Sequence, residues 1–214
     1  MDAKSAPETE AAPSDLFLDR LLDAMLEVAP DMGWTRAALD RAAEKAGLSA
    51  GQALLSAPSG VPDVLEALGK RAARAAGQGV LAADNQKVRA KVRAGVKAWL
   101  AAFALHKPAV KRAAATPANL LTGPKGLWAA ADAIWSALGD KSTDYNWYTK
   151  RMTLVAVLGS TLTAWMGTGD EAEIDAFLDR RIENVMQFEK LKTQAKDAFA
   201  KFPDPLDLFG QHKS

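Results

Sequence analysis

The chain has 214 residues, of which 49% are hydrophobic, with 2 histidines, no cysteine and a formal net charge of +1. This composition excludes disulfides and thiolate chemistry, and it provides no global positive field to attract nucleic acid. It also makes a zinc or di-iron site improbable, so we expect neither a metal nor a cofactor. No apolar run reaches the roughly 18 residues that a membrane-spanning helix needs.

The domain plan follows from composition and periodicity. Residues 1–14 are acidic, rich in Ala and Pro and without arginine, so we expect a disordered tail and no signal or transit peptide. Apolar residues then recur at helical spacing and strand patterns are missing, which predicts an all-α chain. We expect a helix-turn-helix-like region with a linking helix over 15–83, a helical ligand-binding region over 84–187, and an amphipathic helix and tail over 188–214.

Three helices are predicted before residue 58. The first ends at Pro30 and Gly33, because proline breaks a helix and glycine favours its C-terminal cap. Thr35 caps the second helix and Ser49 the third, since their side-chain oxygens accept hydrogen bonds from first-turn amides. Helix, glycine turn and short helix form a helix-turn-helix plan, and the turn Gly47-Leu48-Ser49 makes it resemble the N-terminal domain of tetracycline-repressor-type regulators.

The third helix is the element that would read DNA in such a regulator. Its sequence at 50–57 contains one amide side chain and no Lys, Arg or aromatic residue, with Leu54 and Leu55 expected on the buried side. The nearby cations, Arg36, Arg41 and Lys45, lie on the preceding helix. Because phosphate contacts normally supply most of the affinity for DNA, we favour a retained structural motif. A ligand-responsive transcription regulator remains the alternative.

A linking helix is predicted from Val61 to about Ala83, with its end loosened by Gly77 and Gly79. The next helix, at 87–105, has one apolar face and one basic face. The basic face consists of Lys87, Arg89, Lys91, Arg93 and Lys97. Two interpretations of this face stay open: it is solvated, or it attracts anionic lipid or an acidic partner.

A central helix is predicted after Gly139. It begins within the stretch 142–151, which reads STDYNWYTKR, and continues as an apolar run to Met166. Because this run is apolar around almost its whole circumference, we expect the helix in the middle of the domain. Trp147 and Tyr148, in the first turns of this helix, are either core anchors or functional groups.

Large apolar side chains in the second half of the chain either form core or line an elongated apolar cavity. The candidate lipid-binding residues are Trp128, Trp135, Met152, Val155, Leu158 and Trp165, with Arg151 at the mouth; Trp99, Phe103, Trp147, Met166 and Phe177 are further apolar candidates for the cavity. Arg151 would pair with a phosphate or polar head group, or instead form a salt bridge to Asp144 or to the last body helix. No stretch assembles a nucleophile with a base, a phosphate loop or a metal ligand set, so we expect a protein that is not an enzyme.

The last predicted helix has phenylalanines on one narrow face and lysines around it. A hinge near Gln187 would separate it from the preceding helix, although no helix breaker is present. The candidate membrane-contact residues are Phe188, Leu191, Lys192, Phe199 and Phe202. This pattern is typical of an interfacial membrane helix, but packing on the body or on a second subunit explains it equally well.

Several segments together resemble the Coq-nine family, the accessory lipid-binding proteins of ubiquinone (coenzyme Q) biosynthesis. The stretch 142–151 carries the family signature, and ADAIW at 131–135 and FLDRRI at 177–182 match as well. The opening segments DRLLDA at 19–24 and GWT at 33–35 match more loosely. The resemblance covers the chain from about Leu16 to Met186.

The resemblance implies a tetracycline-repressor-like fold, a homodimer and no DNA reading. It implies binding of a phospholipid or an isoprenoid quinone intermediate, and assistance to the di-iron hydroxylase that acts on demethoxyubiquinone. Asp144, Asn146, Trp147 and Tyr148 would dock the hydroxylase, Arg151 would lie near the lipid head group, and the final helix would touch the membrane. The acidic N-terminus suggests a bacterial member, cytoplasmic and peripheral on the inner membrane.

Overall fold

The computed structural model describes residues 12–84, 86–116, 119, 123–143 and 145–200, except the side chains of 186 and 188–200. Every regular element in these ranges is a helix, which confirms the all-α class. The helices are α1 (Pro13–Met32), α2 (Arg36–Lys45), α3 (Ala50–Ser56), α4 (Val61–Ala82), α5 (Val88–Ala101), the 3₁₀ helix η1 (Ala104–His106), α6 (Lys107–Ala114), α7 (Gly123–Ala137), α8 (Tyr145–Gly167) and α9 (Glu171–Ala200).

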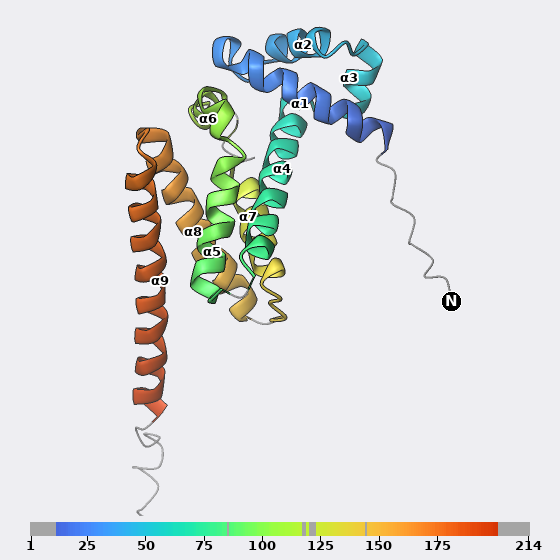
Figure 1. Ribbon diagram of the computed structural model, residues 1–214. Helices are drawn as coiled ribbons and strands as arrows, with labels where there is room; N and C mark the ends of the chain where they lie inside the picture. Colours follow the sequence, from blue (N-terminus) through green and yellow to red (C-terminus); the bar gives the residue numbers. More distant parts are fainter. Residues whose placement is uncertain (1–11, 85, 117–118, 120–122, 144, 201–214) are drawn as a thin grey trace, which may run out of the picture.

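Helices α1, α2 and α3 form one end of the molecule (Figure 1). The predicted caps are confirmed: the Thr35 hydroxyl accepts from the Ala38 amide at 3.1 Å, and Ser49 and Gln52 form a reciprocal capping box. Pro30, however, does not end α1. The helix runs on to Met32 and stops at Gly33, whose φ of 70° is a conformation that favours glycine.

The expected buried side of α3 is wrong. Leu54 and Leu55 are 60% and 64% exposed, whereas Ser56 and Ala57 are buried. Ala53, which was also expected on the buried side, does pack against the core. It shares one face with Ser56 and Ala57, so Leu54 and Leu55 face outward. The cations of α2 are occupied in ion pairs, Arg36 with Asp40 and Arg41 with Glu44, which leaves α3 with an apolar outer face.

Helix α4, and not α8, is the central element. It contacts α1, α5 and α7, and in Figure 1 it runs down from α1 beside α7 and α5. It continues without interruption through Gly77 and Gly79, so the expected loosening of its end is also wrong. A Cβ atom on Gly79 would lie 2.5 Å from the Cβ of Ala98, and one on Gly95 would lie 2.7 Å from Val80. The glycines therefore permit the close approach of α4 and α5.

Helix α8 covers one side of this bundle. Its buried residues lie on one face, and Tyr145, Tyr148 and Met152 are exposed on the other. Large apolar residues had suggested a central helix, but the centre of this fold is rich in alanine and glycine. Such small residues allow the neighbouring helices to pack tightly around α4.

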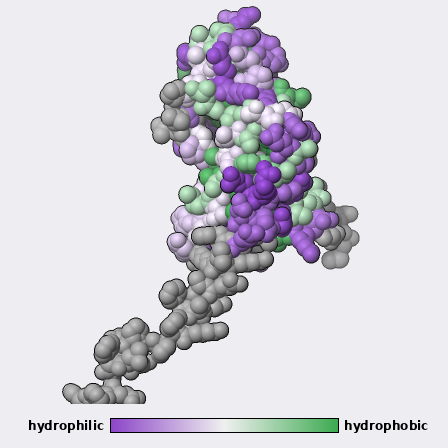
Figure 2. Space-filling view, turned by 90° about the vertical axis from the view of Figure 1, so that its left-hand side faces the viewer, coloured by the Kyte–Doolittle hydropathy of each residue, from purple (hydrophilic) through white to green (hydrophobic). Residues whose placement is uncertain are grey.

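Three of the five cations on the basic face of α5, Arg89, Arg93 and Lys97, pair with α9. Arg93 pairs with both Asp175 and Asp179 at 2.9 Å, Lys97 pairs with Asp175 at 2.7 Å, and Arg89 pairs with Glu183. We call these contacts the α5–α9 ion ladder. The part of the face that carries these three cations is therefore neither simply solvated nor free for lipid. Figure 2 views the side of α9 and shows hydrophilic side chains gathered in the middle of this face.

Helix α9 is continuous from Glu171 to Ala200, without the hinge considered near Gln187. Residue 188, where the C-terminal segment was expected to start, thus lies inside a helix. The ion ladder ends at Glu183, close to the first turn of α5. The remaining 17 residues of α9 extend about 25 Å further, past the other helices in Figure 1.

Candidate functional site

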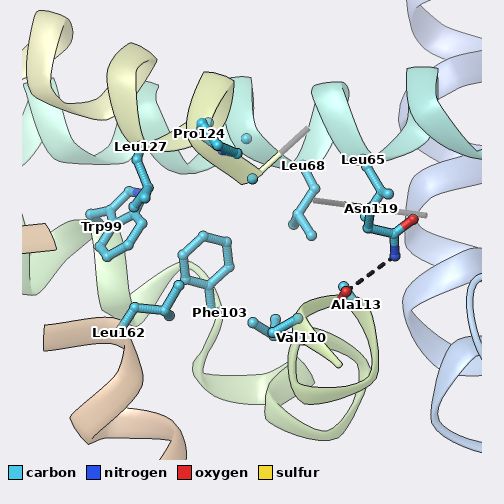
Figure 3. A pocket seen from close by; sticks show the side chains of 14 residues that line it. Leu65, Leu68, Trp99, Phe103, Val110, Ala113, Asn119, Pro124, Leu127 and Leu162 are labelled. Atoms are coloured by element: carbon cyan, nitrogen blue, oxygen red, sulfur yellow. Dashed lines mark hydrogen bonds between the residues drawn. The ribbon is translucent and has the colours of Figure 1, made fainter. Parts of the chain in front are cut away.

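An apolar pocket of about 310 Å³ opens between α4, α5, α6, α7 and α8. Figure 3 shows its side chains converging on one space from these separate helices. It is lined by Leu65, Leu68, Gly69, Trp99, Phe103, Val110, Ala113, Ala114, Asn119, Gly123, Pro124, Gly126, Leu127 and Leu162. Helix α4 supplies one wall and α6 the opposite one.

Two glycines that face each other on α4 and α7 form part of the pocket wall. Gly69 of α4 faces Gly126 of α7, and a Cβ on Gly69 would lie 3.2 Å from the Gly126 Cα. The two helices therefore meet at these glycines, and no side chain fills the space beside them. On the opposite side Trp99 meets Phe103 edge to face, with the ring centroids 5.2 Å apart.

The pocket's lining contains a single amide and no charged side chain. Asn119 donates its amide hydrogen to the Ala113 carbonyl at 3.1 Å (Figure 3). A surface of this kind takes an apolar group, because a charged group would lose its hydration there without a partner.

The predicted lipid-binding residues lie elsewhere. Trp128, Trp135, Met152, Val155, Leu158, Trp165 and Arg151 are all absent from the pocket lining, whereas Trp99 and Phe103 belong to it. Leu158 is fully buried, Met152 is exposed, and Trp165 packs behind Phe103 at 6.5 Å between centroids. Leu65 and Leu68 of α4 line the pocket, and helical periodicity carries no signal for where inward-facing side chains leave a void.

A second feature lies on the surface of α7 and α8, and we call it the aromatic patch: Trp128, Tyr145, Trp147, Tyr148 and Met152. Trp147 meets Tyr148 edge to face at 4.7 Å, and Trp128 lies 5.6 Å from Trp147 and 6.2 Å from Tyr148. Tyr145 and Met152 are exposed three residues before and four after Tyr148, so they share its helix face.

The structure brings three predicted docking residues to one end of α8. Trp147 is half-buried in the aromatic patch, and Tyr148 and Asn146 are exposed. Asp144 lies outside the described residues. Exposed aromatic groups at the end of a helix offer a surface for a protein partner.

Arg151 is not at the mouth of the pocket. It is 2% exposed, and its guanidinium donates to Asp132 at 2.7 Å and to Asp140 at 3.2 Å. The expected salt bridge exists, but its partners are on α7 and on the loop before α8. Since two carboxylates already match its charge, an anionic head group would have to displace one of them.

Asp140 has an unusually acidic carboxyl group. The ammonium group of Lys150 donates to it at 2.7 Å and lowers its pKa well below the usual range. Hydrogen bonds from Ser142 and Arg151 act in the same direction, and together they outweigh the opposing effect of burial. Asp140 is therefore ionised at any physiological pH.

In the part of the chain that the structure describes, no helix is both long and apolar enough to span a bilayer. The same residues contain no group of three or more His, Asp or Glu side chains placed to hold a metal ion. The side chains of Phe188, Leu191, Lys192 and Phe199, and the whole of Phe202, fall outside the described set.

Known proteins resemble this chain over most of its length. A family model described as COQ9 matches residues 120–189, which include the aromatic patch and Arg151. The protein named "Ubiquinone biosynthesis protein COQ9, mitochondrial" from Rattus norvegicus is 27% identical over 91% of the chain and 67% of its own length.

Other relatives carry the same name. Those from Homo sapiens and Xenopus tropicalis are each 27% identical, over 83% and 86% of the chain. The chain spans 60% of the human protein and 62% of the frog protein. The family model and these relatives agree with the resemblance carried by the sequence signature at 142–151: residues 120–189 of the chain match the COQ9 family.

Proposed function

We propose that this protein acts in ubiquinone biosynthesis as a lipid-binding protein without catalytic chemistry of its own. It binds an isoprenoid quinone intermediate and presents it to the di-iron demethoxyubiquinone hydroxylase at the membrane. The observation that carries the proposal is the apolar pocket lined by Trp99, Phe103 and Leu68. The names of the relatives, ubiquinone biosynthesis proteins, support the assignment to this pathway.

The size of the pocket limits what it takes. An apolar cavity of roughly 150 Å³ holds one benzene, so 310 Å³ has room for about two groups of that size. This corresponds to roughly a dozen carbon atoms, or about two isoprene units. The pocket thus takes one section of a polyprenyl tail, and the rest of the tail and the ring lie outside it.

A pocket of this kind lowers the free-energy cost of taking the lipid out of the bilayer. Transfer of an apolar chain from the bilayer into water costs about 0.8 kcal/mol for each CH₂ group. An apolar wall that replaces the bilayer removes this cost for the part of the tail it covers. Presentation therefore needs a pocket, a partner surface and a membrane contact, and it needs no nucleophile.

The aromatic patch is the proposed docking surface for the hydroxylase. Tyr148 is 61% exposed and rests against Trp147. Tyrosine and tryptophan are the residues that most often carry binding energy at protein interfaces, because they bury a large area at a low cost in side-chain entropy. The patch starts at Trp128, next to the pocket residue Leu127, so the two features share α7.

The extension of α9 is the proposed membrane contact. An isolated helix of this length is marginal in water, so the extension beyond Glu183 needs a surface to cover it. The sequence around Phe188 to Phe202 alternates apolar and basic residues, as interfacial helices do. We propose a peripheral location at the membrane that holds the quinone, and a homodimer as the assembly.

Organic extraction of the purified protein followed by mass spectrometry tests the proposal. We expect an isoprenoid quinone or a phospholipid in the extract, and less of it from Leu68→Trp, which fills the pocket. Leu55→Trp introduces the same side chain at an exposed site and is the control. An empty extract from wild type, with no uptake from quinone-loaded vesicles, would refute lipid binding.

A further inference from the structure

The first turns of α8 contain no fully buried residue. Each residue from Tyr145 to Lys150 is exposed or half-buried, and Arg151 is the first buried residue of the helix. These turns carry Trp147 and Tyr148, which are the core of the aromatic patch. Burial in the core therefore does not by itself explain their position.

Arg151 joins three segments at this point. Its Nε donates to Asp132 of α7 at 2.7 Å, and its Nη1 donates to Asp140 in the loop at 3.2 Å. The same Nη1 donates to the carbonyl of Trp147 at 3.3 Å. The side chain thus binds α7, the connecting loop and the first turn of α8 together.

Lys150 adds a second connection between the same segments. Its Nζ donates to Asp140 at 2.7 Å, and its carbonyl accepts the indole N–H of Trp135 at 3.1 Å. Two cations, Lys150 and Arg151, face two carboxylates, Asp132 and Asp140. The cluster is balanced in charge, so it needs no external anion.

The guanidinium also supports the patch directly. Its central carbon lies 4.0 Å from the ring centroid of Trp147, within the range of a cation–π contact. Trp147 is in turn the ring that contacts both Trp128 and Tyr148. An arginine fixed by two carboxylates therefore fixes the plane of the ring that organises the patch.

We propose that Arg151 is a positioning residue for the aromatic patch, held by Asp132 and Asp140, and that it contacts neither lipid nor partner. The inference rests on the proposed docking function and says how the surface is prepared. A patch that is rigid before binding loses less conformational freedom when the partner arrives, which raises affinity.

The test compares Arg151→Lys with Arg93→Lys. Arg93 also bridges two aspartates, but it lies on α5 away from the patch. Lysine keeps the charge and loses the flat, bidentate geometry. We expect Arg151→Lys to reduce the near-UV circular dichroism of the aromatic cluster and to weaken binding to the hydroxylase about tenfold. Arg93→Lys should change neither, and far-UV spectra should stay helical.

Other results would overturn the proposal. One is an Arg151→Lys protein with the near-UV spectrum and the hydroxylase affinity of wild type. Another is an unchanged spectrum with less quinone in the extract, which would make Arg151 a head-group ligand. If Arg151→Lys fails to fold, Asp132→Asn alters the same contact at a half-exposed carboxylate. If wild type does not bind the hydroxylase, the docking function fails while the spectrum still decides whether Arg151 positions Trp147.

Discussion

Arg89 of α5 and Glu183 of α9 form the last rung of the α5–α9 ion ladder, and α9 continues beyond it past the other helices in Figure 1. The ladder is partly exposed, and its apolar support comes from the buried Ile174, Leu178 and Ile182 and the partly buried Val185. Exposed ion pairs are worth about 0.2–1 kcal/mol each. The attachment of α9 therefore depends on salt to an extent that the α4–α5–α7 core does not.

Arg93→Glu tests this dependence. It places a negative charge opposite Asp175 and Asp179 and should lower the free energy of unfolding by about 1–2 kcal/mol at low salt. The loss should shrink in 0.5 M NaCl, because salt screens partly exposed charges. Urea denaturation measures both values. Arg74→Glu, at an exposed arginine of α4 outside the ladder, is the control, and an equal loss there would contradict the assignment.

Substitution of Gly95 tests the close contact of α4 and α5. A Cβ there would lie 2.7 Å from Val80 and 3.0 Å from Ile134. Gly95→Ala should cost about 1–3 kcal/mol, because overpacking outweighs the better helix propensity of alanine. Gly51→Ala in α3 meets no atom within 4 Å and should be neutral or stabilising. Thermal unfolding followed by circular dichroism measures both, and equal effects would mean that the contact is not tight.

Local features of the fold were predictable from the sequence because they depend on neighbouring residues. The caps at Thr35 and Ser49, the stop at Gly33 and the extent of α4 all belong to this class. The prediction for Leu54 and Leu55 failed because the packing of a seven-residue helix depends on what lies around it. Periodicity describes the faces of a helix and does not identify the face that finds a partner.

The candidate site was predictable in part. The stretch 142–151 identified Trp147 and Tyr148, which the structure brings together with Trp128. An apolar cavity was expected, and Trp99 and Phe103 do line the pocket, but the other predicted lining residues lie elsewhere. The position of a void also depends on small residues, such as Gly69 and Gly126, which a search for large apolar side chains overlooks. The ion pairs of α5 with α9 were missed because their partners are 78 to 94 residues apart in sequence.

Tyr148→Lys tests the docking surface with little effect on the fold, since the side chain is largely exposed. We expect binding to the hydroxylase to weaken by about 2 kcal/mol or more, because a charge replaces an aromatic anchor. Pull-down and calorimetry measure the change. Leu105→Lys replaces an apolar residue that is 91% exposed in η1 and should bind as wild type. If Tyr148→Lys bound the hydroxylase as tightly as wild type, the docking surface would have to lie elsewhere on the protein.

Asp140 gives a prediction about pH. Its folded-state pKa is lowered, so its stabilising effect is fully present above the pKa of about 3.9 in the unfolded chain. The effect is lost only as the pH falls toward the folded pKa. Asp140→Asn should therefore cost about 3 kcal/mol, and equally at pH 7 and pH 5. Urea denaturation at pH 7, 5, 4 and 3 should show wild type approaching the variant only below pH 4. If the difference in the free energy of unfolding between wild type and Asp140→Asn disappeared between pH 7 and pH 5, this prediction would be wrong.

Truncation after Gln187 separates the body from the extension of α9. The shortened chain keeps Asp175, Asp179 and Glu183 of the ion ladder and the buried Ile174, Leu178 and Ile182. We therefore expect a folded protein with a melting temperature within a few degrees of the full chain. Its co-sedimentation with anionic vesicles should fall severalfold, since each Lys near such a surface contributes about 1 kcal/mol. Co-sedimentation equal to that of the full chain would place the membrane contact on the body, and loss of folding would mean that the extension packs on a second copy.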